Sequence, residues 1–163
     1  MTDYNVMPDY QTRRKIINDI CEKYSFVHHS FAGKSVCGRC IDVLHIGNTK
    51  NCVLYCAGFH GSEYLTVTAV LKFFEQCADA MENDSVVGRY KIRDFLREKG
   101  LTIVPCVNPD GVEIAIHAPM PLSNTKLLWK KPLKKTKSGR QTQGVWTLTT
   151  TSTQVGTSLK TVN

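Results

Sequence analysis

Apolar residues in the first third of the chain change their spacing from helical to strand-like. They recur at helical spacing over residues 9–24, which predicts an amphipathic helix. Residues 25–31 and 41–46 have the composition of short strands, and residues 47–50 that of a hairpin turn. This part of the chain is therefore predicted to form one helix followed by two strands.

The middle of the chain holds two continuous apolar runs, CVLYCA at residues 52–57 and LTIVPCV at 101–107. Continuous rather than alternating apolar residues predict strands that are buried on both faces of a sheet. Helices are predicted from the end of the first run to about residue 81 and over 86–98. The stripe expected to face the core comprises Leu65, Ala69, Val70, Phe73, Phe74, Cys77 and Met81.

Strands that alternate with helices predict an α/β layered fold. In such folds ligands bind at the carboxyl ends of the strands. Two motifs follow the two apolar runs directly, HGSE at residues 60–63 and NPDG at residues 108–111. The apolar segment 112–116 comes next, and we interpret His117 as a structural residue at the end of a strand. The two motifs are therefore the candidate functional residues.

The net charge of +7 belongs to the end of the chain. Residues 118–163 hold eight Lys and Arg, ten Thr and no acidic residue, whereas residues 1–117 hold 13 basic and 14 acidic residues. We predict two units, a domain over 1–117 and a basic tail over 118–163 that is poorly ordered or read out of frame.

A nucleic-acid-binding function would depend only on the lysines at 130–137 beside Trp129. Such runs of charge are usually solvated, so no nucleic-acid partner is predicted.

The beginning of the chain and its seven cysteines indicate a reducing compartment. The polar, acidic start lacks the apolar segment of a signal peptide, and no apolar run is long enough to cross a bilayer. We expect a cytoplasmic protein that has no disulfide framework and no membrane partner. One alternative remains open: Cys37 and Cys40, in a C-x-x-C motif, could bind structural zinc together with Cys52 and Cys56.

His60 and Glu63 have the chemistry of a metal site. An imidazole at the end of a strand and a carboxylate in the next turn can converge on one Zn²⁺ ion. The same pair is also compatible with a surface histidine beside a glutamate that favours the positive end of a helix. His28, His29 and His45 lie on the early strands, and we predict packing or surface roles for them.

The segments VLYCAGFHGSEYLT and LTIVPCVNPDGVEIAIH together resemble the zinc carboxypeptidase (peptidase M14) family, in particular bacterial γ-D-glutamyl-diaminopimelate-type peptidases that act on cell-wall peptides. The upstream GKSVCGRCIDVLHIG is similar to the family's strand-turn segment with its Gly-Arg pair, here Gly38 and Arg39. The resemblance covers about residues 4–117. It implies a mixed, mostly parallel eight-stranded sheet with helices on both faces, of which this chain supplies the first half.

The resemblance implies Zn²⁺ as the cofactor, with His60 and Glu63 as two of its three protein ligands. It also implies a peptide with a free carboxylate as the substrate, and it places Asn108 and Asp110 at the substrate-binding turn. The family's third ligand, a histidine, its general-base glutamate and its substrate-binding arginines come later. In this chain no histidine follows His117 and no acid follows Glu113. We therefore predict zinc-dependent peptide hydrolysis that is impaired or lost, with a non-catalytic peptide-binding protein as the alternative.

The tail has a second interpretation at the level of its coding DNA. One permitted coding of residues 139–157, read one nucleotide earlier, translates as WKANARGVDLNHNFNAGWH, which resembles the family's next motif, built around G-V-D-x-N. The first two bases of each observed codon fix two bases of each new codon, so the match leaves little freedom. We hypothesise a change of reading frame between about residues 118 and 137. The family's substrate-binding Asn-Arg pair appears as Asn-His in that frame.

Overall fold

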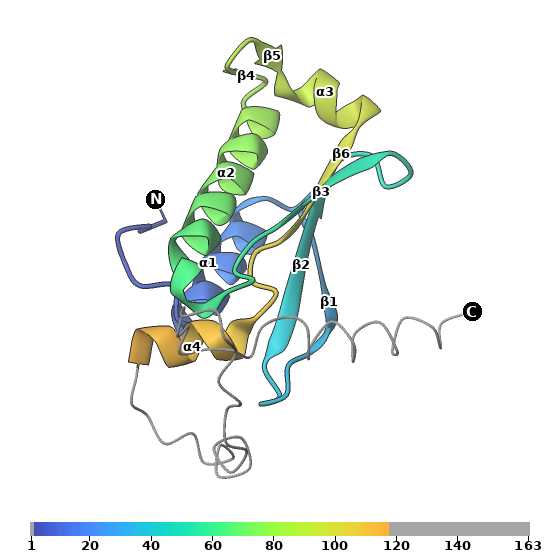
Figure 1. The fold of residues 1–163 in the computed structure, drawn as a ribbon. Helices are drawn as coiled ribbons and strands as arrows, with labels where there is room; N and C mark the ends of the chain where they lie inside the picture. The colour runs from blue at the N-terminus through green and yellow to red at the C-terminus, as the bar shows by residue number, and fades with distance from the viewer. Residues whose placement is uncertain (1, 118–163) are drawn as a thin grey trace, which may run out of the picture.

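A four-stranded mixed sheet organises residues 2–117, which are the residues that the computed structural model describes (Figure 1). The strand order is β1-β2-β6-β3. β1 (His28–Lys34) pairs with β2 (Cys40–Ile46), and β2 with β6 (Gly100–Val104), both antiparallel. β6 pairs with β3 (Cys52–Cys56) in parallel. The predicted mixed α/β fold is confirmed, but only one of the three pairings within this four-stranded sheet is parallel.

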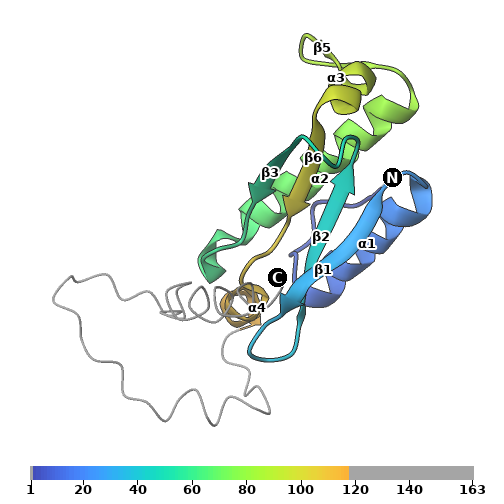
Figure 2. The ribbon, with the colours of Figure 1, turned by 90° about the vertical axis from the view of Figure 1, so that its right-hand side faces the viewer.

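Two long helices cover one face of this sheet. Figure 2 shows α1 (Tyr10–Lys23) and α2 (Tyr64–Glu82) on the same side of the strands. The helices predicted on both faces refer to the eight-stranded sheet of the whole family fold. Asp9 caps α1, because its carboxylate accepts a hydrogen bond from the backbone N–H of Thr12 at 2.8 Å. The core between helices and sheet includes Ile16, Ile17, Ile20, Leu44, Ile46, Val67, Leu71, Phe74, Leu101 and Ile103.

The smaller elements lie around the ends of the sheet. A two-stranded ribbon, β4 (Val86–Val87) and β5 (Tyr90–Lys91), precedes the short helix α3 (Ile92–Glu98). The helix predicted over 86–98 is therefore correct only in its second half, because Gly88 adopts a φ of 64° that forms a turn. No helix among residues 2–117 is long and apolar enough to cross a membrane.

Two other predictions were wrong. Residues 47–50 do not form a hairpin, because β6 lies between β2 and β3. Residues 112–116 belong to a helix, α4 (Pro109–His117), so His117 ends a helix rather than a strand. Asn108 caps the first turn of α4, Pro109 occupies its first position and Asp110 follows, which is a sequence typical of a helix start.

The burial of β3 also differs from the prediction. All five of its residues are exposed, and Leu54 has 58% of its surface accessible. The strand lies at the edge of the described sheet, so it has a neighbour on one side only. Within the stripe predicted for α2, Phe74 and Cys77 are buried, but Leu65 is 71% exposed. The apolar run at residues 52–57 therefore predicts strand β3 correctly but predicts its burial incorrectly.

Candidate metal centre

His60 and Glu63 converge at the carboxyl end of β3. His60 precedes the short 3-10 turn η1 (Gly61–Glu63), and Glu63 leads directly into α2. The Nδ1 atom of His60 lies 2.9 Å from the Oε1 atom of Glu63. The two side chains are 53% and 49% exposed, so a solvated ion could reach both. The structure thus brings together the pair that the sequence predicted as metal ligands.

His60 and Glu63 have side chains of the types that bind zinc, but they are too few to make a complete catalytic zinc site. Imidazole nitrogen and carboxylate oxygen are ligands that zinc uses, and catalytic zinc sites have three protein ligands. Residues 2–117 contain no group of three or more His, Cys, Asp or Glu side chains that could hold a metal. Within these residues the site is therefore two thirds of a ligand set.

The segment that carries the pair, residues 58–63, is called the metal loop below. The parallel pairing of β3 with β6 continues into it through backbone hydrogen bonds. Ala57 N–H donates to Val104 O at 3.0 Å, and Asn108 N–H donates to Gly58 O at 2.9 Å. Gly58 has a φ of 61°, and a Cβ there would lie 2.8 Å from a Val67 methyl group, so this position requires glycine. The loop is thus fixed at its beginning by the strand ahead of it.

Thr66 closes the other end of the metal loop. Its hydroxyl donates to Glu63 O at 2.7 Å and accepts a hydrogen bond from Gly58 N–H at 3.2 Å. One side chain therefore links the first and last residues of the loop. No sequence pattern singles out this threonine, because a hydroxyl one turn into a helix is common and its partners are backbone atoms.

Asn108 lies behind the metal loop, at the start of α4. It is only 6% exposed. Its Oδ1 atom accepts a hydrogen bond from Gly111 N–H at 2.9 Å, and its Nδ2 atom donates to Phe59 O at 3.2 Å. The predicted role of Asn108 in substrate binding stays a prediction, but its observed contacts join the metal loop to α4.

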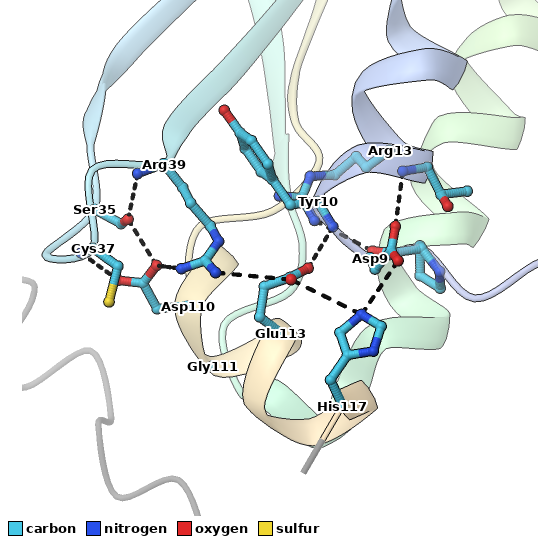
Figure 3. Close-up of polar contacts among 12 residues, drawn as sticks. Asp9, Tyr10, Arg13, Ser35, Cys37, Arg39, Asp110, Gly111, Glu113 and His117 are labelled. Atoms are coloured by element: carbon cyan, nitrogen blue, oxygen red, sulfur yellow. Dashed lines mark hydrogen bonds and ion pairs between the residues drawn. The ribbon is translucent and has the colours of Figure 1, made fainter. Parts of the chain in front are cut away.

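Asp110 contacts the turn between β1 and β2 (Figure 3). Its carboxylate accepts hydrogen bonds from Ser35 Oγ at 2.8 Å, from Cys37 N–H at 3.0 Å and from Arg39 Nη1 at 2.8 Å. Its side chain is 16% exposed. Its role in substrate binding also stays a prediction, and the contacts observed in this structure are all with the protein itself.

A chain of charged groups continues from Arg39 along α4 (Figure 3). Arg39 lies 3.8 Å from the Glu113 carboxylate, which also accepts a hydrogen bond from Tyr10 N–H. His117 lies 3.2 Å from Asp9 and 3.9 Å from Glu113. Burial alone would raise the pKa of Asp9, but hydrogen bonds from Thr12 and His117 outweigh it, so the pKa falls below its ordinary value. These contacts attach α4 to the start of α1.

The remaining histidines lie in the sheet. His29 Nε2 is 2.9 Å from the buried Asp42 carboxylate, which Arg14 also contacts. His45 Nδ1 is 2.8 Å from Thr102 Oγ1, and its ring stacks on that of His28. These contacts are of the packing kind that was predicted for them.

The cysteine-based alternative does not agree with the fold. Cys37 and Cys40 lie at the turn into β2, whereas Cys52 and Cys56 lie on β3, and β6 separates the two strands. Burial, followed by the charge of Asp110, raises the pKa of the Cys37 thiol, and burial raises that of Cys56. Thiols that resist deprotonation are poor metal ligands. The four sulfur atoms therefore do not share one site.

The domain has an α/β fold and presents a His/Glu pair at the end of a strand. These features together are typical of hydrolases that bind a metal ion. Residues 14–158 match the family model of zinc carboxypeptidases (peptidase M14). Because the match extends over more than half of the chain, this chain belongs to the zinc carboxypeptidase family.

Individual relatives agree with this assignment. The chain is 28% identical over 124 residues to γ-D-glutamyl-L-diamino acid endopeptidase 1 of Lysinibacillus sphaericus, covering 74% of this chain and 31% of the relative. It is 27% identical over 112 residues to a zinc carboxypeptidase of Saccharothrix mutabilis subsp. capreolus, covering 65% and 25%. The chain thus spans less than a third of either relative.

The fold is similar to solved carboxypeptidase structures. Bovine thrombin-activatable fibrinolysis inhibitor, solved in complex with a tick carboxypeptidase inhibitor, superposes with a TM-score of 0.59 at 20% identity. The similarity covers 71% of this chain and 36% of the bovine chain. At this level of identity it supports the fold alone.

Proposed function

We propose that this chain supplies the first two zinc ligands of a metallopeptidase that cleaves peptides with a free carboxylate. The observation that carries the proposal is the 2.9 Å separation of His60 Nδ1 and Glu63 Oε1 at the end of β3, in a chain of this family. The relative named for γ-D-glutamyl-L-diamino acid links supports peptides with such links as the substrate class. The proposed cofactor is zinc.

The residues of this chain would hold and orient the ion. His60 and Glu63 would bind it, Thr66 would hold the ends of the metal loop together, and the exposure of both ligands leaves the site open to a peptide. A bound zinc ion would supply Lewis-acid activation of a water molecule. Proton transfer from that water requires a general base, and we propose that it lies outside residues 2–117, as in the family pattern.

The second candidate function is peptide binding without hydrolysis. The composition of residues 118–163 favours it, because they contain no His, Asp or Glu that could complete the ligand set or act as a base. Two ligands hold zinc more weakly than three, and hydrolysis needs the zinc ion. The chain of 163 residues is therefore expected to bind peptides without cleaving them efficiently.

Zinc binding by the full 163-residue chain tests the proposal. Competition with a chromophoric chelator would give the affinity of the parent chain and of the His60→Ala, Glu63→Gln and His28→Ala variants. We expect the first two variants to lose about tenfold or more in affinity, since each lacks a direct ligand. His28 is an exposed histidine on β1, so its variant is the matched control and should bind as the parent does. Equal affinity in all four proteins would contradict the proposal.

A peptide assay separates the two candidate functions. The zinc-loaded chain would be incubated with a γ-D-glutamyl-diaminopimelate peptide, with binding followed by calorimetry and cleavage by mass spectrometry. Binding without cleavage is expected for the chain as written. Cleavage that disappears in His60→Ala would show that the chain is an active peptidase and that the peptide-binding alternative is wrong.

A further inference from the structure

We propose that Asn108 is a positioning residue for the metal loop and that it acts through His60. This inference rests on the proposed function, because it concerns the residue that holds a ligand rather than the ligand itself. It gives Asn108 a task different from substrate contact.

The Asn108 side chain joins two backbone segments that are far apart in the sequence. Its oxygen accepts from Gly111 N–H at 2.9 Å, and its nitrogen donates to Phe59 O at 3.2 Å. A side-chain amide presents an acceptor and a donor side by side. Because Asn108 is 6% exposed, water has little access to replace either bond. The side chain therefore holds the carbonyl immediately before His60 against the start of α4.

The helix at the other end of this bridge is well fixed. Asp110 binds the turn between β1 and β2 through Ser35, Cys37 and Arg39, and Glu113 binds the first residue of α1. The backbone of α4 also touches the metal loop directly. A Cβ on Gly61 would lie 2.1 Å from Gly111 O, so the two backbones are in contact. Helix α4 thus serves as a rigid support for the loop.

The position of the Phe59 carbonyl determines where the His60 ring lies. His60 has an extended backbone, with φ −105° and ψ 140°, and its own carbonyl accepts from Glu63 N–H at 3.0 Å. A rotation of the peptide between Phe59 and His60 would carry the imidazole away from the Glu63 carboxylate. Metal ligands must be held to about 0.5 Å, and loss of an outer-shell partner typically costs about 10–100-fold in affinity.

The variant Asn108→Asp separates positioning from helix capping. Aspartate keeps the oxygen that accepts from Gly111 N–H, and it is an equally good cap. It cannot donate to Phe59 O, and its charge repels that carbonyl. Asn108→Ser is the second variant, because serine also caps a helix but is too short to reach Phe59. If the aspartate variant does not fold, the serine variant decides the question.

The first measurement needs no metal. Amide hydrogen exchange, followed by NMR on the full chain, would compare Glu63 N–H, inside the metal loop, with Gly111 N–H, whose acceptor is retained. We expect exchange at Glu63 to become about fivefold to tenfold faster, which corresponds to the loss of one hydrogen bond, with Gly111 unchanged. Unchanged exchange at Glu63, or equal acceleration at both amides in both variants, would overturn the inference.

The second measurement is the affinity for Co²⁺, read from its absorption spectrum and by chelator competition. The Asn108 variants are expected to bind about tenfold more weakly than the parent, as is typical of outer-shell residues. If exchange at Glu63 accelerates but the parent chain itself binds no metal, the positioning role stands and the proposed function fails. If the parent binds metal and the variants bind equally well, the positioning role is wrong and the proposed function stands.

Discussion

Arg39 and Asp110 form an ion pair with a 2.8 Å separation, although they are 71 positions apart in the sequence. Arg39 begins the return of the hairpin into β2, and Asp110 lies in the first turn of α4. Both side chains are 16% exposed, so the pair is partly shielded from solvent. The contact connects the far edge of the sheet to the helix that supports the metal loop.

Replacing Asp110 by asparagine should lower the stability of the domain. The variant keeps the shape but loses the charge that Arg39, Ser35 and Cys37 contact, so we expect a loss of about 1–3 kcal/mol in the free energy of unfolding. Urea denaturation monitored by circular dichroism would measure it. Asp94→Asn is the matched control, because Asp94 pairs with Arg97 at 4.0 Å on the surface and should change stability by less than about 0.5 kcal/mol. Equal losses would contradict the prediction.

Replacing Gly61 by alanine should disturb the metal loop without removing a polar group. The new Cβ would lie 2.1 Å from Gly111 O, so η1 has to move away from α4. We expect at least about a tenfold loss of zinc affinity, since the ligands on either side of Gly61 are displaced. Chelator competition would measure this loss. Ser62→Ala changes the neighbouring exposed residue and should have no effect; a parent-like affinity in both variants would show that the contact is unimportant.

Much of the fold can be predicted from spacing alone, and the failures have physical causes. Helical periodicity identified α1 and α2, and the two continuous apolar runs identified β3 and β6. Helix α4 was missed because VEIAI is rich in β-branched residues, which favour strands. The helix start at Asn108, Pro109 and Asp110 was visible in the sequence, and it outweighs that local preference.

Only the part of the candidate site that consists of metal-binding side chains could be predicted from the sequence. The His60 and Glu63 pair was singled out because both residue types can bind zinc and because the segments around them resemble the zinc carboxypeptidase family. Thr66 and the bridging role of Asn108 could not be found, because their partners are backbone carbonyls and amides whose positions depend on the tertiary fold. The partner strand of β2 could not be found either, since β6 joins it from more than 50 residues downstream.

The stability contributed by Asp9 should depend on pH. The folded-state pKa of Asp9 lies below its ordinary value of 3.8, so ionised Asp9 stabilises the fold above about pH 4. That contribution is lost as the pH falls through the lower folded pKa. Asp9→Asn keeps the helix cap but not the charge that faces His117. Urea denaturation at pH 7, 5 and 3 should show a parent more stable than the variant at pH 7 and a difference that shrinks toward pH 3; a constant difference would contradict the assignment.

The exposed edge strand β3 should promote self-association. Leu54 is 58% exposed on a strand with an unpaired edge within the described sheet. Leu54→Lys should raise the concentration at which the chain aggregates by several-fold, while the urea midpoint changes little, because an exposed side chain contributes little to the core. Light scattering would measure it. Leu65→Lys, at a 71% exposed position on α2, controls for general hydrophobicity; equal improvement in both would exclude a specific effect of the edge.

The frame hypothesis for the tail lies outside the described residues and is tested on DNA. The nucleotide sequence across codons 115–140 should contain a position after which the other frame encodes WKANARGVDLNHNFNAGWH. Restoring that frame and expressing the longer product should raise zinc affinity and give peptidase activity, since the family's later ligand and base would then be available. If no frame after codon 117 encodes this motif, residues 118–163 are a genuine divergent tail.

The contact between His117 and Asp9 holds the end of α4, the last of the described elements, against the start of α1. His117 lies six residues beyond Gly111, a rise of about 9 Å along α4, and Gly111 touches the metal loop. Any later segment that approaches the metal would thus begin its path about two helical turns from its target. The entropy cost of closing the loop between His117 and such a segment grows only slowly with the length of the loop. Long and variable insertions after α4 can therefore be accommodated while the later ligand still reaches His60 and Glu63.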